Sequence, residues 1–157
     1  MKNLTRFANA HFKSLIKNLE SFNAIQDKET LHQVRVDVKK IKAVLGIIQY
    51  ADKKFKRNKY FKPFRNIFRK AGSIREPDVL FKLLLRYSIE GLADDHLARN
   101  EKSLVESFRS DIPFFLDVIK EQKKKLKPHL RNISKKDVRE YVDKLTKLLA
   151  SQLTPRV

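Results

Sequence analysis

Four side chains that can bind phosphate recur at helical spacing in one short segment of the chain. They stand at positions i, i+3, i+7 and i+10: His32, Arg35, Lys39 and Lys42. At about 100° per residue they form a stripe about 80° wide, beside an apolar stripe that has the spacing of a buried helix face. Like charges stacked along one edge of a helix repel one another until an anion lies along them. The spacing therefore predicts a binding site for a linear polyanion.

A second segment repeats this spacing 30 residues later. Its basic stripe is Lys62, Arg65 and Arg69, followed by Gly72, and its apolar stripe is Phe61, Phe64, Phe68 and Ala71. Residues 53–75 hold ten basic residues and no acid. Two helices joined by a short loop pack side by side, so we expect the two basic edges to face one another across a cationic trough. Lys62, which precedes Pro63, and Lys70 are weaker candidates.

The segments that position these stripes are predicted to be helices, because apolar residues recur at helical spacing almost throughout the 157 residues. Gly and Pro are scarce, at 3 and 5 residues, which disfavours a β-sandwich or barrel. We expect a single all-α domain, an antiparallel bundle of five to six helices. The expected helices cover residues 4–25, 28–51, 61–71 or 64–71, 77–89, 96–127 and 135–153.

Several of these boundaries rest on capping residues. Asp27 is expected to cap the helix over 28–51, and Ser134 with Asp137 should form a capping box for the last helix. In the third helix, Pro63 suits the first turn and Gly72 suits the C-terminal end.

The other boundaries rest on proline and glycine. Pro77 suits the first turn of the fourth helix, and Gly91 should stop it. Pro113 should kink or split the fifth helix, and Pro128 should end it. The apolar residues 114–116 beside Pro113 are expected in the core.

The composition indicates a negatively charged partner. Lys and Arg number 36 against 18 Asp and Glu, a formal net charge of +18 that repels itself in a compact fold. Nucleic acid, an acidic membrane surface or a polyphosphate chain would neutralise this charge. The alternative interpretation is that the charged surface only keeps the protein in solution. No signal peptide and no run of about 18 apolar residues are recognisable, so we expect a cytoplasmic protein without membrane association.

Neither catalysis nor metal binding has a supporting motif. The chain has no cysteine, its four histidines lack ligand spacing, and no Gly-rich phosphate loop or nucleophile motif is present. We therefore expect no catalytic residue, no metal site and no cofactor. Tyr50 and Tyr60, which flank the basic loop, are the stacking candidates that a nucleic-acid binder would need.

The two basic segments resemble the signatures of CHAD domains, the conserved histidine α-helical domains. The first reads His32-x-x-Arg35-Val36-x-x-Lys39-Lys40-x-Lys42. The second, residues 68–79, is similar to a stretch in which a Leu-Gly pair is followed by an Arg-Asp step and by an Asp-Val that opens the next helix. Glu76-Pro77 stands where the family has an Asp followed by an apolar residue.

The resemblance implies a helical bundle that binds inorganic polyphosphate through basic side chains lining a groove. It also implies association with CYTH-type triphosphatases and a cytoplasmic location at polyphosphate granules. By motif position, the binding residues would be His32, Arg35, Lys39, Lys42, Arg69 and Arg75, with Lys40 and Arg65 nearby. Binding to the backbone of DNA or RNA is the alternative function.

The resemblance covers mainly the first of the two helical bundles that family members contain, roughly residues 1–125, and is strongest over residues 28–80. The last expected helix, 135–153, has no His-x-x-Arg motif. The chain is therefore half a domain, a truncated form or a compact variant, with the second bundle largely absent. A homodimer could complete the groove with a second copy.

Overall fold

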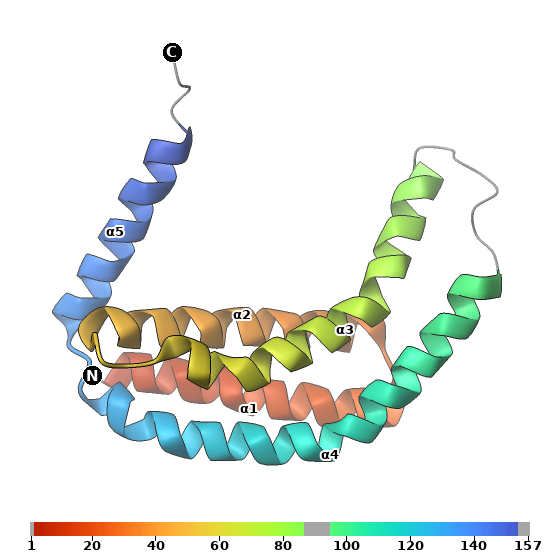
Figure 1. Ribbon diagram of the computed structural model, residues 1–157, viewed down its shortest axis with the longest axis horizontal. Helices are drawn as coiled ribbons and strands as arrows, with labels where there is room; N and C mark the ends of the chain where they lie inside the picture. The colour runs from red at the N-terminus through yellow and green to blue at the C-terminus, as the bar shows by residue number, and fades with distance from the viewer. Residues whose placement is uncertain (1, 87–94, 154–157) are drawn as a thin grey trace.

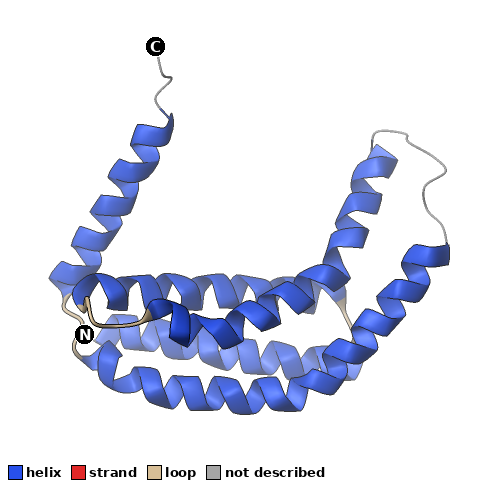
Figure 2. Ribbon diagram, in the orientation of Figure 1, coloured by secondary structure: helices blue, strands red, loops and turns tan. Residues whose placement is uncertain are grey.

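Figure 1 shows the computed structural model, in which residues 2–86 and 95–153 are described. These residues form helices and no strand (Figure 2). The helices are α1 (Lys2–Ile25), α2 (Lys28–Ala51), α3 (Arg57–Arg86), α4 (Asp95–Arg131) and α5 (Lys135–Leu153). The all-α prediction is confirmed, and the described part of the chain has five helices.

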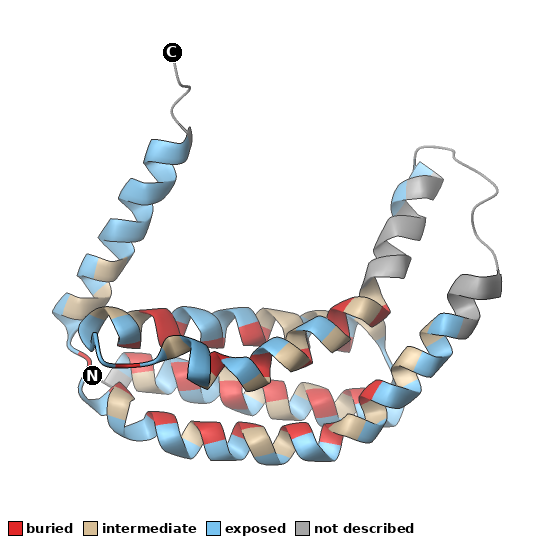
Figure 3. Ribbon diagram, in the orientation of Figure 1, coloured by how far each residue is buried: buried red, intermediate tan, exposed pale blue. Residues whose placement is uncertain are grey.

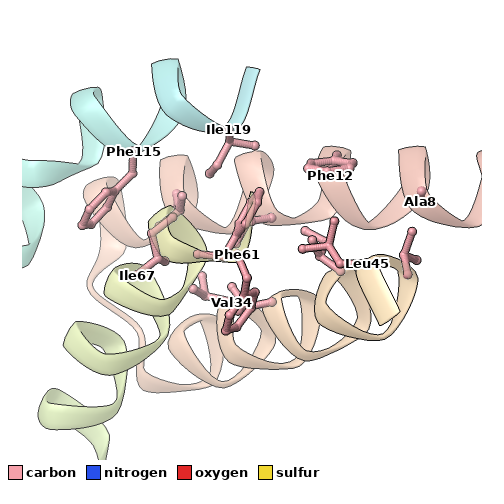
Figure 4. Close-up of a cluster of buried hydrophobic side chains, with 14 of the residues drawn as sticks. Ala8, Phe12, Val34, Leu45, Phe61, Ile67, Phe115 and Ile119 are labelled. Atoms are coloured by element: carbon pink, nitrogen blue, oxygen red, sulfur yellow. The ribbon is translucent and has the colours of Figure 1, made fainter. Parts of the chain in front are cut away.

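Helices α1 to α4 pack around one apolar core. α2 lies between α1 and α3, and α4 packs against both α1 and α3. Figure 4 labels two core residues from each helix in turn: Ala8 and Phe12, Val34 and Leu45, Phe61 and Ile67, Phe115 and Ile119. Each large side chain buried in this way stabilises the fold by roughly 1.5–3 kcal/mol. The core thus holds α2 and α3, which carry both basic stripes, side by side.

Three helical segments leave the bundle. In Figure 1, α5 rises from one end, while the C-terminal part of α3 and the N-terminal part of α4 rise at the other. α5 contacts α2 and contributes Val138 to the margin of the core. Four further apolar residues of α5 are 40–58% exposed, in keeping with the pale colour of this helix in Figure 3: Val142, Leu145, Leu148 and Leu149.

The helix starts predicted from Asp27 and from Ser134 with Asp137 are confirmed. Asp27 caps α2, since its carboxylate accepts hydrogen bonds at 3.0 Å from both the amide and the hydroxyl of Thr30. Gln26, just before it, ends α1 in the left-handed conformation with φ 53°. At α5, the Asp137 amide donates to the Ser134 hydroxyl oxygen at 3.1 Å, while the Ser134 amide donates back to the carboxylate at 2.8 Å.

We expect Asp27→Ala to lower the melting temperature at neutral pH by roughly a few degrees. Hydrogen bonds, first of all from the Thr30 backbone, hold the pKa of Asp27 below its ordinary value of 3.8. A carboxyl whose pKa is lowered on folding stabilises the protein above its ordinary pKa, and this contribution is lost as the pH falls through the lowered pKa. The difference between the variant and the wild type should therefore vanish in strong acid.

Thermal unfolding followed by circular dichroism, from neutral pH to about pH 2, measures this difference. Asp117→Ala is the matched control, because Asp117 is exposed on α4. An Asp27 effect that is independent of pH would contradict the capping interpretation.

α3 shows that the expected ends of the third and fourth helices are wrong. It is one helix from Arg57 to Arg86, so Gly72 does not end it, and neither Pro63 nor Pro77 lies in a first turn. One buried stripe runs straight through this region: Phe64, Ile67, Ala71 and Ile74, each at most 1% exposed. Burial of Ile74 beyond Gly72 outweighs the cost of about 1 kcal/mol of a helical glycine. Gly91 lies outside the described residues.

α4 is longer than expected and contains both of its prolines. Pro128 does not end it, because Leu130 beyond the proline is 3% exposed and continues the core stripe. Pro113 does not split it either, and the helix curves along its length in Figure 1, in keeping with the expected kink. Phe115 is buried, but Phe114 is 65% exposed, so the expectation that both belong to the core is wrong for Phe114.

Candidate functional site

The cations of the α2 stripe pack on phenylalanine rings of α3. The Arg35 guanidinium carbon lies 4.5 Å from the centroid of the Phe68 ring, and the Lys39 Nζ lies 5.9 Å from the same centroid. The Lys42 Nζ lies 5.3 Å from the centroid of the Phe61 ring. A cation over an aromatic face is attracted by the ring quadrupole, and its aliphatic stem covers apolar surface. The rings therefore hold the stems while the charges reach solvent.

The basic residues of α3 lie between these rings and α4. The Arg65 guanidinium carbon lies 5.8 Å from the Phe61 centroid, so Arg65 shares this ring with Lys42. Arg69 is exposed and donates to the Asn66 Oδ1 at 3.5 Å. A hollow of about 460 Å³ between α3 and α4 is lined by these groups and by apolar side chains: Lys62, Pro63, Arg65, Asn66, Arg69, Phe114, Phe115 and Val118.

Cations of the two basic stripes thus meet on one surface, since Lys42 of α2 and Arg65 of α3 share the Phe61 ring. The α2 cations and Arg65 gather over Phe61 and Phe68, whereas Lys62 and Arg69 line the hollow on the α4 side of α3. Beneath these cations lie Phe61, which is 7% exposed, and Phe68, which is partly buried against the core. We name this surface the basic face, made of Arg35, Lys39, Lys42, Lys62, Arg65 and Arg69.

The other candidate residues lie at the edges of the basic face or away from it. His32 is half-buried near the start of α2, and Arg75 is half-buried on α3, beyond Arg69. Lys40 is exposed, but it lies about 100° around the helix from Lys39 and so leaves the stripe. Lys70 forms an ion pair with Asp111 of α4, which already compensates its charge.

Most charges of the basic face have no acidic partner. Among residues 2–86 and 95–153, no ion pair joins the following residues to an acid: Lys39, Lys42, Lys62, Arg65 and Arg69. Cations one helical turn apart, about 5.4 Å, repel one another when no counter-charge lies between them. These charges are therefore uncompensated by acids within the described residues, and the aromatic rings beneath them support their stems.

Sequence reasoning missed a buried carboxylate within the α2 motif. Asp37 is 3% exposed and accepts hydrogen bonds from the Ser14 hydroxyl at 2.7 Å and the Asn18 amide at 3.1 Å. The His11 Nδ1 lies 2.8 Å from its other oxygen. A lone acid among basic residues resembles a solvated surface residue. The sequence of α1 did hold a sign of this buried carboxylate, because His11, Ser14 and Asn18 stand at i, i+3 and i+7 and so form a polar patch on one helix face.

The aromatic residues that flank the basic loop have partners within the protein. The Tyr60 ring stacks on Phe55 with a centroid distance of 4.5 Å, and its hydroxyl lies 3.4 Å from the His129 Nε2. The Tyr50 ring lies 5.8 Å from the Tyr141 ring of α5. Tyr60 is thus part of the packed end of the bundle, and Phe114 is the more exposed aromatic side chain beside basic residues.

The described residues hold no group of three His, Cys, Asp or Glu side chains placed to bind a metal ion. None of their helices is both long and apolar enough to cross a bilayer.

Comparison with known proteins places the chain in a family. No curated protein and no solved structure matches the sequence. The family model described as "CHAD domain" matches residues 6–156, which is nearly the whole chain and includes α5 as well as both basic segments. This match agrees with the motif around His32 and with the all-α fold. The chain belongs to the CHAD domain family.

Proposed function

We propose that this protein binds inorganic polyphosphate along the basic face and does not catalyse a reaction. The observation that carries the proposal is the row of α2 cations at one-turn spacing, packed on Phe61 and Phe68 and continued by Arg65. Membership of the CHAD family supports it.

The chemistry of the basic face fits a chain of phosphates. Each arginine can direct two donors onto phosphate oxygens, whereas each lysine supplies a compact point charge. Because the charges repeat along a helix edge, they can follow a linear polyanion without reading a sequence of bases. Release of condensed counterions should then make the affinity fall steeply with salt, as it does for DNA-binding proteins.

Phe114 is the observation that favours the alternative, binding of nucleic acid. It is 65% exposed beside Arg65 and Arg69, where a base could stack while the arginines bind the backbone. One exposed ring offers stacking for a single base, whereas the row of cations on α2 can bind several phosphates, so polyphosphate is the preferred ligand.

A competition experiment separates the two ligands. The protein is bound to a fluorescent single-stranded oligonucleotide, and long-chain polyphosphate or unlabelled DNA is added at equal phosphate concentration. We expect polyphosphate to displace the probe at least tenfold more effectively, and Phe114→Ala to leave polyphosphate affinity unchanged. DNA competing as well as polyphosphate would reject the proposal in favour of the alternative.

Two partners belong to the same proposal. A CYTH-type triphosphatase would supply the catalysis for which the basic face has no groups, and a second copy of the chain would extend the face. A homodimer would have twice the 18.5 kDa mass of the chain in light scattering with polyphosphate present. A monomer at every concentration would reject the homodimer and leave the binding proposal standing.

A further inference from the structure

A second basic pocket lies where α5 leaves α2, outside the basic face. Its volume is about 320 Å³. Its lining comes from the C-terminal half of α2, the connection to α3, the first residue of α3 and the N-terminal half of α5: Gly46, Gln49, Tyr50, Lys53, Arg57, Tyr141 and Lys144.

Gly46 makes the pocket possible. It is buried, and a Cβ at this position would overlap the Tyr141 hydroxyl and lie 3.1 Å from the Tyr141 Cζ. The absence of a side chain therefore lets the phenol of α5 lie against the backbone of α2. Gly46 also lies one turn beyond Lys42 on the line of the α2 stripe, about 6 Å further along the helix. Tyr141 thus stands at the point where an anion following this stripe would arrive.

Three cations converge on this point. The Lys53 Nζ lies 4.7 Å and the Lys144 Nζ 5.8 Å from the centroid of the Tyr50 ring. The Arg57 guanidinium carbon lies 3.8 Å from the position that a Gly46 Cβ would occupy. None of these three cations has an acidic partner within 4 Å among the residues that the structure describes.

The two tyrosines of the pocket differ in their hydrogen bonds. The Tyr50 hydroxyl donates to the Glu140 carboxylate at 3.3 Å. Burial, together with the negative charge of Glu140, raises the pKa of Tyr50, so that its hydroxyl stays protonated. The Tyr141 hydroxyl has no hydrogen-bond partner within the described ranges, 2–86 and 95–153. It is a spare donor. The nearby acids have other partners: Glu140 contacts Tyr50 and Lys136, and Asp137, whose charge also acts on Tyr50, accepts from Ser134.

We propose that this pocket binds a terminal phosphoryl group, with Lys53, Arg57 and Lys144 as counter-charges and the Tyr141 hydroxyl as a donor. A terminal phosphate carries three free oxygens and nearly two negative charges at neutral pH, since its second pKa is about 6. An interior phosphate of a chain has two free oxygens and one charge. Because Tyr141 stands on the line of the stripe, a chain lying on the basic face would end in the pocket. This assignment to a chain end rests on the proposed function, whereas a small phosphomonoester could supply the same group.

Calorimetry with two ligands tests the proposal. One is linear polyphosphate of a single length, and the other is the same chain esterified at both ends. We expect the free-ended chain to bind the wild type about tenfold more tightly, and this ratio to fall to about one in Lys53→Ala/Lys144→Ala. Lys120→Ala/Lys124→Ala removes the same charge from exposed positions of α4 and should keep the ratio. Tyr141→Phe keeps the ring and removes the donor, so it should lower the ratio about threefold without weakening the esterified chain.

The outcomes separate this inference from the proposed function. Equal affinity of free-ended and esterified chains for the wild type would overturn the terminal pocket and leave polyphosphate binding intact. If neither chain binds, the proposed function fails, and phenyl phosphate then decides about the pocket alone. Binding of phenyl phosphate that is lost in Lys53→Ala/Lys144→Ala would support a phosphomonoester site, and no such binding would overturn it.

Discussion

Replacing Arg35, Lys39 and Lys42 together by alanine is expected to weaken polyphosphate binding by roughly a hundredfold or more at moderate salt. A hydrogen bond to a charged group contributes about 1.5–3 kcal/mol, and exposure to solvent lowers this to roughly 1 kcal/mol for each contact. Three such contacts amount to about 3 kcal/mol, which is about two powers of ten in affinity. The loss should fall on the affinity alone, since the rings beneath these cations, Phe61 and Phe68, are retained.

The chain offers a matched control for the position of these charges. Lys120, Lys124 and Lys127 have the same i, i+4, i+7 spacing on α4, are all exposed, and lie outside the basic face. Their replacement by alanine removes the same net charge. Because these lysines lie outside the basic face, we expect the affinity for polyphosphate to fall less than threefold.

The salt dependence gives a second measurement. Loss of three phosphate contacts should reduce the slope of log affinity against log salt concentration by about 2 to 3 for the α2 variant. For the α4 variant, the slope should stay close to that of the wild type. If both variants lose affinity equally, net charge and not the basic face determines binding. Circular dichroism must show unchanged helicity, because Arg35 is half-buried against Phe68.

The sequence was sufficient where a local rule decided the structure. Asp27 and Ser134 satisfy the free amides of a helix N-terminus through their own neighbours, and α2 and α5 begin where these residues predict. The stripes on α2 were likewise readable, because spacing along one helix sets which side chains share a face. These predictions needed no knowledge of the other helices.

The sequence was insufficient where packing between distant segments decided the structure. Gly72 and Pro128 are local stop signals, but Ile74 and Leu130 beyond them are buried by other helices, and the helices continue. The same limit applies to the site. Which ring lies beneath each cation depends on the rotation of both helices, so the packing of Arg35 and Lys39 on Phe68 could not be read from spacing alone.

Asp37→Ala is expected to destabilise the fold by about 3 kcal/mol, the largest effect on stability among the single changes considered. Removing one member of a buried, charged group leaves its partners unsatisfied, at a cost of about 3–5 kcal/mol in proteins. Here the His11 side chain is 15% exposed, so water can reach part of the group, and the lower end of that range applies. The melting temperature should fall by roughly 6–12 °C. Asp37→Asn keeps an acceptor but loses the charge, so its effect should be smaller.

A double-mutant cycle with His11→Ala measures how much of this cost belongs to the contact itself. The two residues lie 2.8 Å apart, so we expect the double variant to be more stable than the sum of the single losses predicts, by about 1–2 kcal/mol. Asp117→Ala, an exposed carboxylate on α4, should change stability by less than about 0.5 kcal/mol. If the losses from His11→Ala and Asp37→Ala are additive, the contact between these two side chains contributes nothing to the stability of the fold.

The Asp37→Ala variant also separates the stability of the bundle from the function of the basic face. Asp37 lies on the flank of α2 that faces α1, whereas Arg35 and Lys39 lie on the flank that faces α3. A ligand that binds only the folded state raises the melting temperature by an amount set by its concentration and affinity. Saturating polyphosphate should therefore raise the melting temperature of Asp37→Ala as much as that of the wild type. At the same concentration it should raise the melting temperature of the variant without Arg35, Lys39 and Lys42 by much less. If Asp37→Ala also abolished the rise, the carboxylate would orient the cations of α2 as well as anchor the helix.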